Sequence, residues 1–279
     1  MAFKASKTRS VKAADPIGRG TPIVPSAAID VWYRKELKAM MKAMLDDYKK
    51  EIYRTANSGQ GEVFYATDAL FSSVFESTLK SLQQRWGRIF EGFAEKLSPD
   101  FVNKVEGQAT SATIHSLSVA GLKAPVAAYN SNVANTIQAS VDFNHTLITG
   151  LAKEAHERVY TAVMLSLTSP NPEEQGLDGI TAALTKAGIH SKKRADLIAR
   201  DQTSKIYSSL SDARMEQNGC EEFEWLHSSA GKVPRHTHVE KDGQIFKLND
   251  PRLWEGPKAD QGPPGWAINC RCRKVPVFR

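Results

Sequence analysis

The sequence predicts a mainly α-helical protein that ends in a compact α+β domain with a small antiparallel sheet. Two observations support this fold class. Apolar residues recur at the spacing of amphipathic helices through most of residues 29–168. After residue 219 the pattern changes to short alternating runs between glycines and prolines, which is typical of strands and turns. With 279 residues and 41% hydrophobic content, the chain is long enough for a substantial core.

We expect residues 1–28 to form an extended basic arm. This segment contains three prolines, two glycines and few large apolar residues, so it offers little to a core. The first 20 residues carry a net charge of +4, and residues 271–279 carry another +4. The remaining 250 residues sum to −2, so the excess positive charge lies at the two ends.

The two basic ends are candidates for contact with DNA. Basic arms bind phosphate without reading sequence, and such binding weakens steeply with salt. The alternative is that the charged ends only keep the protein soluble. The candidate residues are Lys4, Lys7, Arg9, Lys12, Arg273, Lys274 and Arg279.

Residues 29–172 are predicted to form a helical scaffold or docking region. A first amphipathic helix starts at Ile29 and ends at the SGQG segment 58–61, and a second begins near residue 67. The sequence Ser98-Pro99-Asp100 predicts the start of a third helix, because proline is favoured at the first helical position.

The rest of this region is also predicted to be helical. Residues 107–144 form helix with breaks near Gly121 and Pro125, and residues 144–167 form an amphipathic helix that the SPNP segment 169–172 ends. Its aromatic residues and methionines fall at helical spacing, which is typical of a core. We therefore expect no chemistry in this region.

Residues 173–279 are predicted to form the compact α+β domain. It opens with a short helix that closes at Gly188, and a long helix follows from Ser191 to Gly219. Alternation in the segment EEFEWLHSS then predicts a strand whose phenylalanine and tryptophan share one face.

The end of the chain is predicted to contain two more strands around a long loop. An Asp242-Gly243 turn leads into a short strand. Residues 249–268 contain four prolines and three glycines and are expected to form a long ordered loop. The segment RCRKVPVF predicts a final strand, and Pro276 favours an edge position for it.

The three cysteines favour a reducing compartment, because an odd number does not suit a disulfide scaffold. No apolar run approaches the roughly 20 residues that a membrane helix needs. The basic N-terminal segment also lacks the apolar core of a secretory signal. We therefore expect synthesis in the cytosol and no contact with a membrane.

A zinc site is the first chemical interpretation of the C-terminal domain. Its candidate ligands are His236, His238, Cys270 and Cys272. Imidazole and thiolate together suit zinc, and two residues at i and i+2 on a strand present their side chains on one face. The one-residue gap between the cysteines differs from the usual spacing of zinc knuckles.

Three alternatives stay open for these residues. A disulfide between Cys270 and Cys272 would close a very small ring, which disulfide geometry disfavours. A metal-dependent nuclease could use His236, His238 and Asp242 to activate water, with the basic arms holding its substrate. A hydrogen-bonded network could instead anchor the loop 249–268 against the sheet, because such loops contribute little core of their own. We favour this structural role, with or without a metal ion.

Five blocks of the C-terminal domain occur in a specific order. A helix carries Ala199 to Thr203, and a strand follows around Trp225. Arg235 and His238 come before the Asp242-Gly243 turn, and a Pro264-Gly265 pair precedes the Cys-Arg-Cys segment 270–272. In this order the domain resembles the phage Mu F-like head morphogenesis family, the minor head proteins of tailed bacteriophages. The resemblance covers about residues 177–279, and its motif residues are Arg200, Asp201, Gln202, Trp225, Arg235, His238, Asp242, Gly243, Gly265 and Asn269.

The resemblance implies a virion protein that acts in head morphogenesis near the portal vertex. Its expected partners are the portal protein, the major capsid protein, or both, and it would occupy the host cytoplasm during assembly. Contact with packaged DNA, or ejection with it, is also implied. Family members often carry an Asp-x-Arg step where this chain has Gly231-Lys232-Val233. That departure favours a non-enzymatic protein over the nuclease or an ejected effector enzyme using His238 and Asp242.

Overall fold

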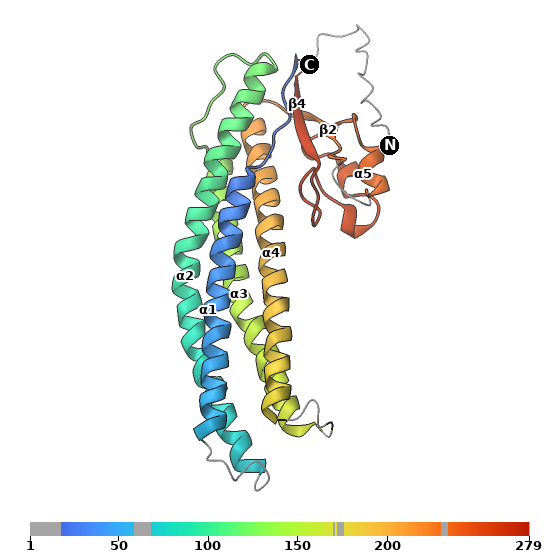
Figure 1. Ribbon diagram of the computed structural model, residues 1–279. Helices are drawn as coiled ribbons and strands as arrows, with labels where there is room; N and C mark the ends of the chain where they lie inside the picture. The colour runs from blue at the N-terminus through green and yellow to red at the C-terminus, as the bar shows by residue number, and fades with distance from the viewer. Residues whose placement is uncertain (1–17, 59–67, 170, 172–175, 230–233, 279) are drawn as a thin grey trace, which may run out of the picture.

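Four long helices form an elongated bundle, and a small sheet unit lies beside one end of it (Figure 1). The computed structural model describes residues 18–58, 68–169, 171, 176–229 and 234–278. The bundle helices are α1 (Ala27–Ser58), α2 (Asp68–Val119), α3 (Ser131–Thr168) and α4 (Gly176–Gln217). The sheet unit follows α4, so the predicted fold class, mainly α with a C-terminal α+β domain, is confirmed.

The bundle is held by apolar stripes of the kind that the sequence predicts. In α1 the buried positions recur every three or four residues and face the other helices; they are Tyr33, Leu37, Met41, Met44, Tyr48 and Ile52. Tyr33 stacks on Phe101 of α2, with ring centroids 3.7 Å apart. The core thus runs along the whole length of the bundle.

Two predicted helix breaks are wrong. Pro99 lies inside α2, and Gly188 lies inside α4. Proline costs a helix about 3 kcal/mol, because it removes one backbone hydrogen bond and crowds the preceding turn. Here Phe101 and Val102 follow directly and are fully buried, so their packing offsets that cost. The break predicted near Gly121 and Pro125 is confirmed, since α2 ends at Val119.

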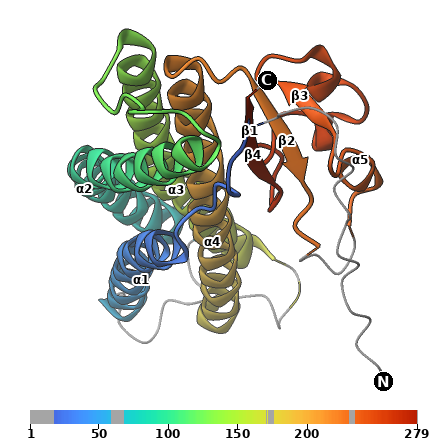
Figure 2. The ribbon, with the colours of Figure 1, turned by 90° about the horizontal axis from the view of Figure 1, so that it is seen from above.

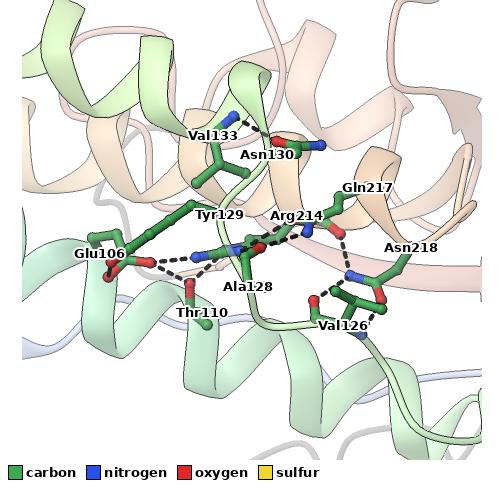
Figure 3. A network of polar contacts seen from close by, with 10 residues as sticks. All are labelled: Glu106, Thr110, Val126, Ala128, Tyr129, Asn130, Val133, Arg214, Gln217 and Asn218. Carbon is green, nitrogen blue, oxygen red and sulfur yellow. Dashed lines mark hydrogen bonds and ion pairs between the residues drawn. The ribbon is translucent and has the colours of Figure 1, made fainter.

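A polar network fixes the connection between α2 and α3 (Figure 3). The Arg214 guanidinium of α4 is 1% exposed and donates to Glu106 (2.7 Å) and Thr110 (2.7 Å) of α2. It also donates to the carbonyl of Ala128 in the connecting loop (2.8 Å). Tyr129 donates to the second carboxylate oxygen of Glu106 (2.9 Å). One buried side chain therefore joins two helices and a loop.

The sheet contains four antiparallel strands in the order β1-β4-β2-β3. They are β1 (Gly18–Arg19), β2 (Glu222–Leu226), β3 (Ile245–Lys247) and β4 (Arg273–Phe278). The aromatic side chains of Phe223 and Trp225 lie on one face of β2 and are completely buried, as the alternation predicts. The loop between β2 and β3 carries the short helix α5 (His236–Glu240), and the loop between β3 and β4 carries two 3-10 turns, η1 (Pro251–Trp254) and η2 (Lys258–Asp260).

The segment before α1 differs from a free arm. Residues 1–17 lie outside the described part, but Gly18 and Arg19 pair with β4, and Ile23 is buried against the core. A Cβ atom on Gly18 would lie 2.1 Å from the carbonyl oxygen of Ala120, so only glycine fits there. This added strand makes β4 an inner strand, and the edge position predicted from Pro276 is wrong. The Pro276 carbonyl accepts from the amide of Gly20, the residue that follows β1 (2.9 Å).

Helix α4 belongs to both parts of the molecule. Its first half packs against α1 and α3, and its second half carries the sheet unit, whose strand β2 begins three residues beyond Gly219 (Figures 1 and 2). The predicted boundary near residue 173 falls between the end of α3 and the start of α4. Among the described helices, none combines the length and apolar content needed to cross a membrane.

Candidate metal centre

Three side chains converge in the core of the sheet unit: His238, Cys270 and Cys272. Their candidate ligand atoms all lie within 4.8 Å of one another, and all three residues are at most 5% exposed. His238 comes from α5, whereas the two cysteines lie directly before β4. The group therefore connects two loops to the sheet.

The hydrogen bonds of His238 fix which of its nitrogens faces the sulfurs. Its Nε2 lies 3.0 Å from the carbonyl oxygen of Asp260, which can only accept, so Nε2 carries the proton. In the neutral imidazole, Nδ1 then presents a lone pair to Cys270 Sγ at 3.6 Å and Cys272 Sγ at 3.7 Å. Metal-binding histidines are usually oriented by such a hydrogen bond from their other nitrogen.

The separations match those of a tetrahedral zinc site. Zinc bonds of about 2.3 Å to sulfur and about 2.0–2.1 Å to nitrogen separate two such ligands by roughly 3.5–3.6 Å in a tetrahedron. The two observed Sγ–Nδ1 distances lie close to these values. The group could therefore hold a metal ion such as zinc, as the sequence analysis proposes for three of its four candidates. Three ligands leave one position of a tetrahedral ion for water or another group.

The electrostatics of the cysteine pair favour one thiolate. The pKa of Cys270 is lowered to about 4, first because the Cys272 thiol donates to it, and also through His238 and the Gly265 amide. The pKa of Cys272 is raised, because it faces this thiolate and is buried. Thiolate is the form that binds metal. For His238, burial lowers the pKa, but contacts with Cys270 and the Asp260 carbonyl outweigh this effect and raise it.

His236 does not join the group, so this part of the predicted ligand set is wrong. The sequence analysis places His236 and His238 on a strand, where both would face one side. They lie instead on helix α5, where residues two apart point in nearly opposite directions. His236 is consequently exposed. The third cysteine, Cys220, is buried elsewhere, with its Sγ 3.6 Å from the carbonyl oxygen of Val277.

The remaining motif residues hold the loop that carries the cysteines. Arg235 forms an ion pair with Asp260 (2.7 Å) and donates to the carbonyl of Ile268 (2.9 Å). Arg200 of α4 donates to the Asn269 side chain (3.1 Å). Asn269 adopts a positive φ of 61° at the turn before Cys270. These contacts are those of an anchoring network around the loop.

Gly265 brings this loop against α4. Its φ is 89°, and a Cβ atom there would lie 3.0 Å from Ser204 Oγ. Both the left-handed conformation and the close approach require glycine. The Gly265 amide points to Cys270 Sγ at 3.4 Å, so the Pro-Gly block of the sequence also supports the sulfur.

Five other motif residues lie around this network. Trp225 packs edge-on against His238, with centroids 5.1 Å apart. Gly243 donates its amide to the Trp225 carbonyl (2.7 Å), and Asp242 accepts from the His227 amide (2.9 Å). Asp201 and Gln202 are buried in α4, where Asp201 pairs with Lys205 (2.8 Å). Asp242 is thus used in a turn rather than beside the His238 ring nitrogens.

The sequence analysis misses two contributors to this unit. Asp260 orients His238 through its backbone carbonyl and Arg235 through its carboxylate. The sequence around Asp260 shows no pattern that predicts either contact. Lys274 is a predicted DNA contact, and this prediction is wrong. Its ammonium is 3% exposed and bound to Asp212 and to Ser208 Oγ (2.7 Å). Successive residues of a strand point to opposite faces, and Arg271 and Arg273 point to the more exposed face. This alternation could have predicted that the Lys274 side chain points into the core.

Fold and cluster together define a class of protein: an elongated helical bundle carrying a small sheet domain with a buried imidazole–thiolate group. Residues 173–275 match the family described as phage Mu protein F like protein. Over these residues the chain is similar to that family, and the resemblance seen in the sequence is confirmed for them.

One relative extends the match into the bundle. An uncharacterized protein of Haemophilus influenzae strain Rd is 29% identical over 260 residues, which is 92% of this chain. The match covers 55% of the relative, so the chain spans about half the length of that protein. No solved structure matches the chain significantly.

Proposed function

We propose that the protein is a minor head protein of a tailed bacteriophage that acts in head morphogenesis. The observation that carries this proposal is the Mu F-like domain over residues 173–275. In this role the protein belongs to the virion head near the portal vertex, and it occupies the host cytoplasm during assembly. Its partners are the portal protein, the major capsid protein, or both.

The bundle is the part suited to docking. It presents long helical faces, and its exposed large apolar residues include Phe143, Tyr160 and Leu165 on α3. The experiment is a pull-down of the tagged chain against the portal and major capsid proteins encoded by the same genome. We expect capture of at least one of them, together with the protein in purified heads. Capture of neither, with heads that lack the protein, would refute the role.

We propose no catalytic role for the motif histidine and aspartate. Both ring nitrogens of His238 are engaged, one by the Asp260 carbonyl and the other by the sulfurs. Asp242 holds a turn. The test is incubation of the purified protein with DNA or RNA and divalent metal beside a His238→Ala variant. Cleavage that this substitution abolishes would restore the alternative of a metal-dependent nuclease or ejected effector enzyme.

We also propose that His238, Cys270 and Cys272 hold one structural zinc ion. The bound ion would connect α5 and the cysteine loop to the sheet, and would compensate for the small apolar core of this unit. Elemental analysis of the purified chain is expected to give close to one zinc per chain. The Cys272→Ser variant should lose the metal, whereas Cys220→Ser should keep it, because Cys220 lies outside the group. Equal metal contents in the two variants would contradict the proposal.

A further inference from the structure

Two adjoining hollows lie on the face of the bundle between α1 and α4. One, of about 370 Å³, lies between the start of α1, Arg200 of α4 and the cysteine loop. The other, of about 450 Å³, lies further along α1 toward Lys42 and Lys192. Arg34 lines both hollows, and we refer to the two together as the α1/α4 basic groove. Helices α1 and α4 lie side by side in both views (Figures 1 and 2).

This α1/α4 basic groove is lined by eight cationic side chains. They are Arg34, Lys35, Lys38, Lys42, Lys192, Arg200, Arg271 and Arg273. Asp30 is the one carboxylate among the described residues that line it. The groove therefore carries a strong positive charge.

Ion pairs neutralise only part of that charge. Asp30 and Asp196 pair with Arg34, Asp196 also pairs with Lys38, and Asp46 pairs with Lys42. Three carboxylates thus serve eight cations. Within the described residues no carboxylate pairs with the other five cations: Lys35, Lys192, Arg200, Arg271 and Arg273.

The start of α1 adds to the same potential. Ser26 and Ala27 line the first hollow, and α1 begins at Ala27. The first turn of a helix presents free amide groups and the positive end of the helix dipole. Together with the arginine side chains, these groups favour an anion with several acceptor oxygens.

The counts of charge along the sequence conceal this groove. Outside the two ends the chain sums to −2, because acidic side chains elsewhere on the molecule balance the cations. Folding gathers cations from residues 34–42, 192–200 and 271–273 onto one face. Because these segments are far apart in the sequence, no single stretch of the sequence predicts the groove.

We infer that the α1/α4 basic groove binds the phosphate backbone of a nucleic acid without reading its sequence. Residues 27–42 of α1 span about 22 Å at 1.5 Å per residue. That length meets several successive phosphates of a DNA strand, which lie about 3.4 Å apart along the axis. Arginine forks bind phosphate oxygens in pairs, and lysines add point charges along the track. The inference deepens the proposed role in head morphogenesis and rests on that role for its biological setting.

The test measures binding of a fluorescent 20-base-pair duplex to the full chain by anisotropy over a series of salt concentrations. The groove variant is Lys35→Ala, Lys192→Ala and Arg271→Ala combined. These side chains are exposed and have no carboxylate partner among the described residues, so the fold should persist. The matched control removes three exposed lysines from α2, the following loop and α3: Lys80→Ala, Lys123→Ala and Lys153→Ala.

We expect the groove variant to bind at least about tenfold more weakly than wild type at low salt, and the slope of log K against log salt to fall by about 2 to 3. The control should change both quantities much less. A second variant, Lys35→Glu with Lys192→Glu, leaves the cysteine loop intact and should weaken binding likewise.

Equal losses in groove variants and control would overturn the inference, as would a wild-type chain that does not bind duplex DNA at low salt. Competition by inorganic phosphate at equal charge concentration would show that the groove binds free anions only, and would also overturn it. The pull-down with portal and capsid proteins is independent of these results, so the inference can fail while the proposed function stands.

Discussion

The bundle and the sheet unit are stabilised in different ways. The bundle has a long apolar core, and its main buried ion pair, Arg214 with Glu106, lies at one end where the α2–α3 loop must be fixed. The sheet unit has short strands, one short helix and a loop of 25 residues between β3 and β4. Its interior is correspondingly polar: the buried Lys274, paired with the partly exposed Asp212, and the His238–cysteine group. A unit with little apolar core needs specific polar or metal contacts to define one structure.

The largest effect is expected from Lys274→Ala. It leaves Asp212 facing a buried site without its cation, and breaking such a pair costs about 3–5 kcal/mol. Lys274→Met should cost less, because it fills the space, particularly when combined with Asp212→Asn. Chemical denaturation measures both, and Lys247→Ala on the exposed face of β3 is the control. A loss below about 1 kcal/mol for Lys274→Ala would contradict a stabilising role for this pair.

Arg214→Ala should be next, with a loss of about 3 kcal/mol. The substitution leaves Glu106 buried without its main partner and frees the Ala128 carbonyl (Figure 3). The matched control is Arg158→Ala, which breaks an exposed pair with Glu154 and should cost under about 1 kcal/mol. Similar losses for the two arginines would show that burial does not distinguish them.

Glu106 gives the bundle an acid-sensitive contribution. Burial raises its pKa, but hydrogen bonds from Thr110, Arg214 and Tyr129 outweigh this effect and lower the pKa below its ordinary value near 4.5. The resulting stabilisation is complete above pH 4.5 and is lost as the pH falls through the lowered pKa. Glu106→Gln should therefore be less stable than wild type near pH 7 but lose less stability on acidification. Parallel pH profiles of the two proteins would contradict this.

The smallest effect is expected at the start of α3. The Asn130 side chain accepts from the Val133 amide (2.9 Å), and removing such a cap costs about 1 kcal/mol. Asn130→Ala should lower the unfolding free energy by that amount. Asn135→Ala, on an exposed turn of the same helix, should leave it nearly unchanged. A cost at residue 135 equal to that at residue 130 would argue against the cap.

Periodic patterns predicted the fold better than single residues did. The α1 stripe and the β2 alternation were right because many side chains support each. Pro99, Gly188 and Pro276 misled the prediction because each local preference is worth only about 1–3 kcal/mol, which packing of distant segments offsets. The strand β1 could not be read at all, since its two residues pair only with the far end of the chain.

Three of the four candidate metal ligands come together as predicted. Cys270, Cys272 and His238 follow from residue type, but the choice between His238 and His236 depended on whether the segment is a strand or a helix. The basic groove was missed because its cations come from three separate segments. In both cases the sequence shows which residues could bind a metal ion or an anion, but the fold decides which of them come together.

Hydrogen exchange with and without a zinc chelator tests the central contrast most directly. Removal of the proposed zinc ion from His238, Cys270 and Cys272 should strip protection from β2, β3, β4 and α5, while α1, α2 and α3 keep theirs. The Cys220→Ser protein should respond to the chelator as wild type does. Unchanged protection in the sheet unit, or an equal loss in the bundle, would contradict the account.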